Sequence, residues 1–211
     1  MPALRIAITN QKGGTGKTTL ALNLAAGLHR RGSTLVLDTD PQGSISQWAS
    51  IGDASDLPDV QHVPGDDVEA QIMRQMRVHH YLVVDCPPTI HANYVDKVLT
   101  NVDMVLVPIQ PSPVDLWASL AIADAVRDST KQNPRLKAFA VLNQLDVRNT
   151  LSRSMHEALA ELEFPTLQAG ISRRAAYRNA AMEGTSVYGL GTRGKAAVQE
   201  IEAIIEEISK T

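Results

Sequence analysis

Cysteine is nearly absent from this sequence, since Cys86 is the only one among 211 residues. A single cysteine forms no disulfide within the chain and supplies no cysteine cage for zinc or an iron–sulfur cluster. The six histidines show no metal-ligand spacing either. We therefore expect a protein of the reducing cytoplasm, in which Cys86 is a small packing residue.

Long hydrophobic runs are also missing, because no segment approaches the roughly 18 apolar residues of a membrane span. The first residues, MPALRIAITNQ, become polar too soon for a signal peptide. A last amphipathic helix is predicted over 193–209, with four glutamates on its polar side. A helix lying on a membrane surface would carry Lys and Arg there. We therefore expect this helix to pack on the protein's own sheet, and we expect no membrane partner.

Net charge is small but unevenly distributed. The total is −3, so the chain as a whole lacks the basic composition of a nucleic-acid-binding protein. From Lys131 to Lys195, however, there are ten Lys and Arg against five Asp and Glu, a balance of +5 that leaves −8 for the rest. Such asymmetry can mark a binding face for a polyanion. It is equally compatible with an ordinary solvated basic surface.

The distribution of apolar residues predicts a doubly wound α/β fold. Short runs rich in Val, Ile and Leu are typical of strands covered on both faces, and they alternate with helical stretches. This alternation favours a mostly parallel sheet flanked by helices, and the length favours one domain over 1–211. An irregular region is expected at 51–67. The strands are expected at 3–9, 33–38, 81–85, 103–109, 136–143 and 165–171, and the helices at 16–31, 66–79, 91–101, 113–131, 149–163, 172–183 and 193–209.

The segment NQKGGTGKTT follows the first predicted strand and opens the first predicted helix. This order is typical of a P-loop, in which backbone N–H groups surround phosphate oxygens at a helix N-terminus. In that pattern Lys17 contacts the β- and γ-phosphates, and the Thr18 hydroxyl is a ligand of Mg²⁺. The strict pattern has glycine where this chain has Gln11, so a glycine-rich turn without a ligand is the alternative. The expected nucleotide-binding residues are Gly13, Gly14, Thr15, Gly16, Lys17, Thr18 and Thr19.

Three aspartates, Asp38, Asp40 and Asp85, stand at or just after the ends of predicted strands. The carboxyl ends of parallel strands face the crevice in which α/β sheets bind ligands. Carboxylate oxygens at that edge are suited to Mg²⁺. Each aspartate could equally cap the turn that follows its strand.

The motifs KGGTGKTT, DTDPQGS and DCPP, with ISRRAAYRNAAMEGTSVYG nearer the C-terminus, resemble the ParA/MinD superfamily of P-loop ATPases over nearly the whole chain. KGGTGKTT is similar to the deviant Walker A motif of that superfamily. The chain looks most like the small, ParF-like partition ATPases without an N-terminal helix-turn-helix, so site-specific autorepression is not expected.

The resemblance also implies roles for individual residues. It implies that Lys12 reaches across a dimer to the second subunit's ATP phosphates, which makes it catalytic together with Lys17. It implies that Asp40 orients the attacking water, that Asp85 is the Walker B aspartate of the Mg²⁺ shell, and that Asp38 supports this metal from nearby.

Two further segments carry weaker implications. In relatives an asparagine near the position of Asn143 reads the adenine edge, although Asn143 could equally cap the next helix. The proline-rich segment PIQPSPVDL, residues 108–116, resembles one that lies near the nucleotide and the dimer interface in small ParA proteins.

For function, the resemblance implies an ATPase that forms a homodimer on Mg-ATP and binds DNA without sequence preference. Its slow hydrolysis of ATP to ADP and phosphate would be stimulated by a ParB-like or other cargo adaptor protein. Such a protein is cytoplasmic and nucleoid-associated. It moves a plasmid, a chromosome, a chemotaxis cluster or a microcompartment, and the sequence does not say which.

The candidate DNA-binding residues lie in the basic part of the chain. Arg173, Arg174 and Arg178 stand on or before a predicted helix, and Lys195 follows nearby. Arginines spaced in this way can share a helix face and neutralise several phosphates without reading bases. An ordinary solvated basic helix is the alternative.

Other ATPase classes fit less well. A MinD-like membrane oscillator would need a basic C-terminal helix, and an iron–sulfur ATPase would need more cysteines. A P-loop ligase or kinase of the dethiobiotin synthetase type is the main rival, and its turnover would depend on a small metabolite. A nucleotide-gated binding module with negligible hydrolysis is also open.

Overall fold

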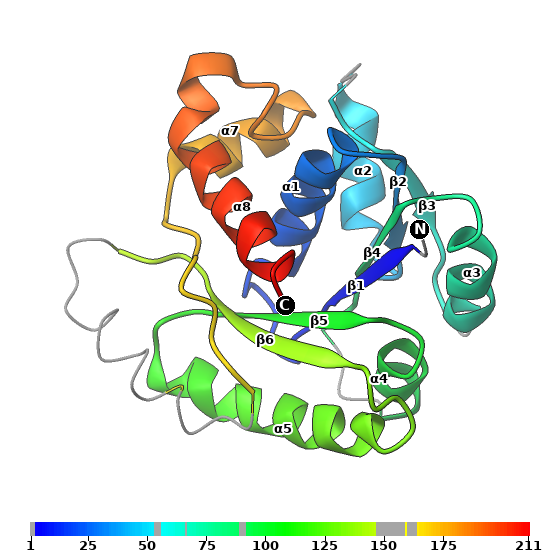
Figure 1. Ribbon diagram of the computed structural model, residues 1–211. Helices are drawn as coiled ribbons and strands as arrows, with labels where there is room; N and C mark the ends of the chain where they lie inside the picture. Colours follow the sequence, from blue (N-terminus) through cyan, green and yellow to red (C-terminus); the bar gives the residue numbers. More distant parts are fainter. Residues whose placement is uncertain (1–2, 53–55, 66, 89–91, 147–158, 160–163) are drawn as a thin grey trace.

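The computed structural model describes residues 3–52, 56–65, 67–88, 92–146, 159 and 164–211, and its described strands form one parallel sheet with the order β3-β2-β4-β1-β5-β6 (Figure 1). The predicted doubly wound parallel sheet is therefore confirmed. The strands are β1 (Leu4–Ile8), β2 (Thr34–Asp38), β3 (Asp59–His62), β4 (Tyr81–Asp85), β5 (Met104–Ile109) and β6 (Lys137–Leu142).

Helices cover both faces of this sheet (Figure 1). The helices α1, α2, α7 and α8 pack on one face, and α3, α4 and α5 pack on the other. Their bounds are α1 (Lys17–His29), α2 (Ser44–Ile51), α3 (Val68–Gln75), α4 (Ala92–Leu99), α5 (Pro113–Thr130), α7 (Ala175–Glu183) and α8 (Lys195–Ile208), and a 3₁₀ helix η1 (Gly191–Gly194) precedes α8.

Each face of the sheet has its own hydrophobic core. In β1, Ile6 and Ile8 belong to the core under α1, whereas Ala7 belongs to the core under α4 and α5, as the two-residue period of a strand requires. From α8, Ile201 and Ile205 are fully buried in the first of these cores. The prediction that the C-terminal helix packs on the protein itself is thus confirmed. Within the described ranges, no helix is long and apolar enough to cross a membrane.

The predicted irregular region at 51–67 is wrong in part, because it contains β3. This strand pairs with β2, and its sequence DVQH carries no apolar pattern because β3 lies at the sheet edge, where its residues are partly or fully exposed. The helix α2, which buries Ile45 and Trp48, was not predicted either. Its eight residues are too few to show a clear helical period.

The segment 165–171 is not a regular strand, contrary to the prediction. It runs beside β6, where Leu167 N–H donates to the Ala140 carbonyl and Ala140 N–H donates to the Pro165 carbonyl. Only an isolated bridge, between Ala140 and Thr166, is formed there. The predicted helix at 149–163 falls almost entirely outside the described residues. The remaining predicted strands agree with the structure to within one residue at each end, and the remaining helices to within four.

The order of the strands places the loop after β1 at a switch point. The chain first builds β2, β3 and β4 on one side of β1 and then crosses to β5 and β6 on the other. At such a point the loops beyond the carboxyl ends of the strands diverge and leave a crevice. The glycine-rich segment and the three aspartates all lie at this edge of the sheet.

Candidate nucleotide-binding site

The loop of residues 9–16 joins β1 to α1 and has the conformation that its glycines allow. Gly14 and Gly16 have φ values of 77° and 90°, which residues with a Cβ rarely adopt. At Gly16 a Cβ would also lie 2.1 Å from Asn143 Nδ2. Gly16, the N-cap residue of α1, offers no side-chain cap, and the first turn of α1 holds no acidic residue. The helix N-terminus therefore keeps its unpaired N–H groups and its positive dipole end for an anion.

Lys17, the first residue of α1, is buried in the curve of this loop, with 6% of its surface exposed. Its Nζ donates a hydrogen bond to the Lys12 carbonyl over 3.1 Å. Burial lowers the pKa of Lys17, while the nearby charges of Asp85 and Asp40 act in the opposite direction. An anion in the loop would restore the charge balance of this ammonium group.

Two buried aspartate oxygens at the same edge of the sheet accept no hydrogen bond within the described part of the chain, Asp85 Oδ1 and Asp38 Oδ1. The other Asp85 oxygen accepts from the Thr18 hydroxyl over 2.9 Å. Burial raises the pKa of Asp85 to about 7, although the Thr18 hydrogen bond opposes this shift. Unsatisfied buried oxygens are unusual in folded proteins, and a divalent cation would satisfy them.

These residues fit Mg²⁺ only when a ligand completes its coordination. Among the described residues, no group of three or more His, Cys, Asp or Glu side chains could hold a metal ion alone. Mg²⁺ is typically bound through one or two carboxylates together with water and substrate phosphates. Thr18 and Asp85 would hold the ion directly or through water, with Asp38 close by.

Asp38 and Asp40 also fix the chain that follows β2. Asp38 Oδ2 accepts hydrogen bonds from Ser46 N–H and Oγ–H, at 2.9 and 2.7 Å, in the first turn of α2. One of the two Asp38 oxygens therefore caps the turn that follows its strand, which was the alternative role considered for this residue. Asp40 Oδ1 accepts from Gln42 N–H over 2.9 Å, and the Asp40 carboxylate contributes to the pKa of both Lys17 and Asp85.

Lys12 lies at the mouth of the loop and is paired within its own chain. Its Nζ is 2.7 Å from Asp115 Oδ2 in the first turn of α5. Asp115 is buried and also accepts a hydrogen bond from the Ser112 hydroxyl, whereas 37% of the Lys12 side chain is exposed. Sequence reasoning missed Asp115, because the pattern Ser112-Pro-Val-Asp signals a helix start and not a contact with a distant lysine.

Three amide side chains, from the segments that follow β5 and β6, donate hydrogen bonds to the loop of residues 9–16. Asn143 Nδ2 donates to the Thr15 carbonyl over 2.6 Å, and its Oδ1 accepts from Gln144 N–H. Gln110 and Gln144 both donate to the Gly14 carbonyl, at 2.6 and 3.2 Å. Both amide atoms of Asn143 are thus engaged with backbone, and its predicted contact with a base stays a prediction. Sequence reasoning did not identify Gln110 or Gln144.

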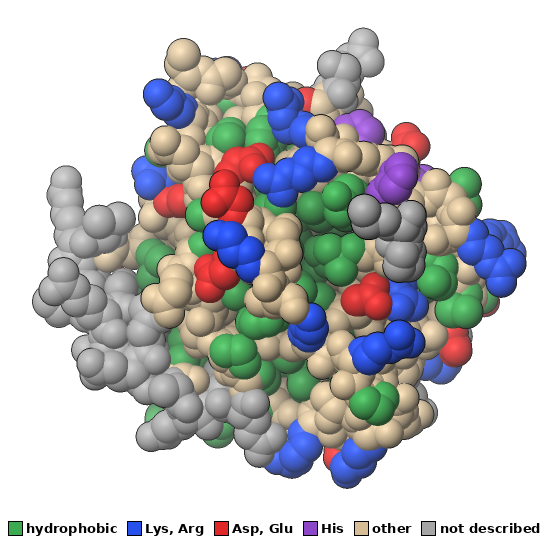
Figure 2. All heavy atoms as spheres, in the orientation of Figure 1, with side chains coloured by type: hydrophobic (Ala, Val, Ile, Leu, Met, Phe, Trp, Pro, Cys, Tyr) green, Lys and Arg blue, Asp and Glu red, His purple; other side chains and the backbone are tan. Residues whose placement is uncertain are grey.

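A cavity of about 220 Å³ extends from the loop toward α7. Arg173, Arg174 and Arg178, predicted for DNA, all line it, and Arg174 also pairs with Glu200 over 2.8 Å. In the face shown in Figure 2, acidic and basic side chains are interspersed, without a continuous basic surface. Lys195 is exposed at the start of α8 and does not line the cavity. The lining residues are Gly16, Thr19, Asn143, Gln144, Ile171, Ser172, Arg173, Arg174, Tyr177 and Arg178.

The pKa of Asp85 generates a prediction for the protein without nucleotide and metal. Because burial raises this pKa to about 7, from about 3.9 in an unfolded chain, the folded state holds the proton more tightly. The free energy of unfolding should then fall as the pH rises between these values. Asp85→Asn removes this titration. We expect the variant to gain stability relative to the wild type as the pH rises from about 4 to about 7, measured by urea unfolding in EDTA. A stability difference that is independent of pH would contradict the assignment.

The chain is similar in sequence and in fold to several known proteins. It is 39% identical to the maintenance of carboxysome distribution protein A of Halothiobacillus neapolitanus, over 98% of this chain and 96% of that protein. It is 31% identical to the chromosome partitioning protein ParA of Caulobacter vibrioides, over 73% of this chain and 74% of that protein. Its fold is similar to an ATP complex of a Cyanothece McdA variant, with a TM-score of 0.75 and 16% identity over 99% of this chain and 97% of that one.

A family assignment follows from the extent of these matches. Residues 6–187 match the CobQ/CobB/MinD/ParA nucleotide binding domain, and this range contains the glycine-rich loop, the three aspartates and the cavity. The resemblance to the ParA/MinD superfamily is thereby confirmed. The chain belongs to the CobQ/CobB/MinD/ParA family of nucleotide-binding proteins.

Proposed function

We propose that this protein is a ParA-type ATPase that binds Mg-ATP, dimerises around two nucleotides and hydrolyses ATP to ADP and phosphate. The observation that carries the proposal is a set of buried or unpaired charges at the carboxyl edge of β1, β2 and β4. Among the described residues, the N-terminus of α1 has no side-chain cap, Lys17 is buried, and Asp38 and Asp85 each have one carboxylate oxygen that accepts no hydrogen bond. A triphosphate with Mg²⁺ supplies both missing charges at once.

We assign each part of the nucleotide to a part of this site. The phosphates would occupy the loop in front of Lys17, and the nucleoside would occupy the cavity that extends from Gly16 toward Tyr177. Phosphoryl transfer to water depends mainly on positioning and charge neutralisation. Mg²⁺ supplies part of that neutralisation when bound, Lys17 supplies the rest, and Asp40 orients the water.

Lys12 is the residue that connects the nucleotide to a second subunit. The phosphates of its own chain are already served by Lys17 and by the N-terminus of α1, and 37% of the Lys12 side chain is exposed. To reach a second nucleotide, its ammonium must leave Asp115. Dimerisation would therefore exchange one carboxylate partner for phosphate oxygens of the other subunit's ATP.

This exchange predicts separate effects of Lys12 on dimerisation and on stability. Lys12→Ala should abolish ATP-dependent dimerisation, and it should also lower the free energy of unfolding by about 1–3 kcal/mol, since the buried Asp115 loses its cation. The double variant Lys12→Ala/Asp115→Asn should recover stability and stay monomeric. Light scattering with a non-hydrolysable ATP analogue and urea unfolding measure the two effects. Dimerisation of Lys12→Ala at the wild-type protein concentration would disprove the role.

The role of Asp40 predicts a loss of turnover without a loss of binding. Asp40→Asn should reduce the single-turnover rate by about 100-fold or more, within the range of a lost water-activating group, while the Kd for Mg-ATP changes little. The measurements are phosphate release and binding of a fluorescent ATP analogue. Equal losses in both would contradict the role. Negligible wild-type turnover with DNA and adaptor present would favour a nucleotide-gated binding module, and turnover that requires an organic acid would favour a ligase.

We further propose that the ATP-bound dimer binds DNA without sequence preference, and that it is released when an adaptor protein stimulates hydrolysis. The basic segment from Lys131 to Lys195 supports a polyanion as partner. Arg173 and Arg178 are exposed and border the proposed nucleoside cavity. From this position, a bound nucleotide could change the orientation of the two arginine side chains and so their contacts with DNA. Arg174 contributes less freely, because Glu200 already binds it.

The DNA proposal predicts salt-sensitive binding that depends on these arginines. The variant Arg173→Ala/Arg174→Ala/Arg178→Ala should bind duplex DNA more weakly, and the slope of log K against log salt should decrease by about 0.9 for each phosphate that the variant no longer neutralises. Because these residues line the cavity, the Kd for ATP is measured in parallel. Lys195→Ala tests a position outside the cavity, and Arg135→Ala, exposed beyond α5, is the control. Undiminished binding by the triple variant would refute the placement.

For the cargo we propose a protein microcompartment of the carboxysome kind. The relatives named for carboxysome distribution are 39% and 33% identical over 96% and 92% of their own lengths, a more complete match than the Caulobacter partitioning protein gives. The test is to delete the gene and follow fluorescently labelled shells and a labelled chromosomal origin in the same cells. Clustered shells with normally placed origins would support the proposal, and the reverse would favour chromosome segregation.

A further inference from the structure

The loop that carries Asp40, residues 39–43, is held at both of its ends. At its start, Thr39 N–H and Oγ–H both donate to the Asp85 carbonyl, at 3.1 and 2.7 Å. Beyond its end, Ser46 donates to Asp38. Within the loop, Gly43 N–H donates to the Asp40 carbonyl over 2.8 Å. These internal bonds fix the shape of the turn, but they do not fix where Asp40 lies relative to the sheet.

A side chain from the neighbouring strand reaches Asp40 directly. His62 Nε2 lies 3.1 Å from the Asp40 carbonyl oxygen. Since a carbonyl only accepts, this contact requires the proton on Nε2. The ring also borders Gly43, where a Cβ would lie 3.6 Å from both Cε1 and Nε2 of His62. The imidazole thus packs against the turn and holds the residue that the proposed reaction uses.

The sheet itself sets the position of this histidine. His62 ends β3, and the parallel register places it opposite Asp38, the last residue of β2. Val63 N–H then donates to the Asp38 carbonyl over 2.8 Å. His62 therefore stands at the carboxyl edge of the sheet, next to the start of the Asp40 loop.

We propose that His62 is a positioning residue for ATP hydrolysis, which holds the Asp40 carbonyl so that the Asp40 carboxylate faces the site of Lys17 and Asp85. This inference rests on the proposed ATPase function and on the role of Asp40 within it. The physical reason is the steep dependence of such reactions on geometry, because a displacement of about 1 Å can cost about 100-fold in rate. His62 does not line the cavity proposed for the nucleoside, so we expect the effect on turnover and not on binding.

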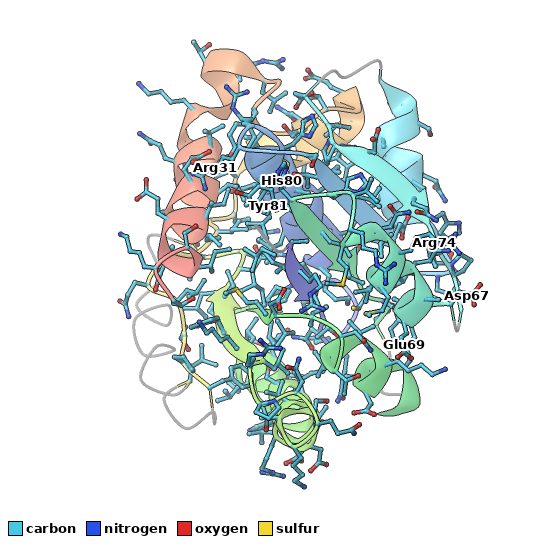
Figure 3. All side chains as sticks on the ribbon, turned by 45° about the vertical axis from the view of Figure 1, so that its right-hand side comes forward. Arg31, Asp67, Glu69, Arg74, His80 and Tyr81 are labelled. Atoms are coloured by element: carbon cyan, nitrogen blue, oxygen red, sulfur yellow. The ribbon has the colours of Figure 1, made fainter. Side chains whose placement is uncertain are left out.

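The test compares two variants of His62 with a matched histidine elsewhere. His62→Ala removes the donor, whereas His62→Gln keeps an N–H donor at similar reach. His80→Ala is the control: His80 is also exposed, its ring bonds to Ser33, and it lies directly before β4 at the amino end of the sheet (Figure 3). The readouts are the single-turnover rate at saturating Mg-ATP, the Kd for the nucleotide and the thermal midpoint.

We expect His62→Ala to lower the single-turnover rate by about 10-fold and to leave the Kd unchanged. This loss is smaller than the roughly 100-fold that displacing a reacting group by about 1 Å can cause. His62→Gln should restore most of the rate, and His80→Ala should match the wild type. In an Asp40→Asn background, His62→Ala should cause no further loss, because the two residues act as a unit.

Three results would overturn the inference. These are a wild-type rate for His62→Ala, a rate for His62→Gln as low as that for His62→Ala, or a full additional loss in the Asp40→Asn background. The proposed function itself fails on different results, namely no hydrolysis by the wild type or normal turnover by Asp40→Asn. A normal rate for His62→Ala together with an inactive Asp40→Asn variant would reject His62 alone.

Discussion

The buried carboxyl group of Asp85 is the constraint on which the site depends. Asp85 ends β4, between β1 and β2, and its register places it opposite Ile8 and Asp38. Its side chain accepts from Thr18 at the start of α1, and its carbonyl accepts from Thr39 at the start of the Asp40 loop. One residue thus connects the start of α1, the sheet and the loop that carries Asp40. The burial that raises its pKa to about 7 is the cost of keeping a carboxylate inside the protein, where the proposed Mg²⁺ would bind.

Much of this site was predictable because its parts are local in sequence. The glycines, Lys17 and Thr18 lie in one short segment, and Asp38 and Asp85 end strands whose apolar runs are plain. β3 was not predictable, because an edge strand of polar residues shows no hydrophobic period. Asp115 and Gln110 could not be predicted for another reason: they contact the loop of residues 9–16 from positions that are 103 and 96 residues away in the sequence. A single sequence holds no local pattern for such contacts. The contact of His62 with Asp40, 22 residues away, could not be predicted for the same reason.

The pairing of Lys12 with Asp115 bears on how dimerisation would depend on nucleotide. In the single chain, the lysine already has a buried carboxylate partner at 2.7 Å. A ligand can shift an equilibrium only by the difference in its affinity for the two states. Phosphates of a second ATP must therefore offer the ammonium more than Asp115 does. If the proposed function is correct, this competition would disfavour dimers that lack a triphosphate. In the monomer, Asp115 would also keep Lys12 from binding other anions.

The cavity beside α7 gives the proposed DNA binding a connection to the nucleotide. Arg173 and Arg178 stand at the cavity wall together with Gly16 and Thr19 of the phosphate-loop end. If the nucleoside lies there, the same two arginines would border the nucleoside on one side and contact DNA on the other. Coupling between two ligands is reciprocal, so DNA would then change the affinity for ATP by the factor by which ATP changes the affinity for DNA. On this proposal, α7 would carry one end of the coupling and α1 the other. The buried hydrogen bond from Tyr177 to α8, which itself contacts α1, would then help to fix their relative positions.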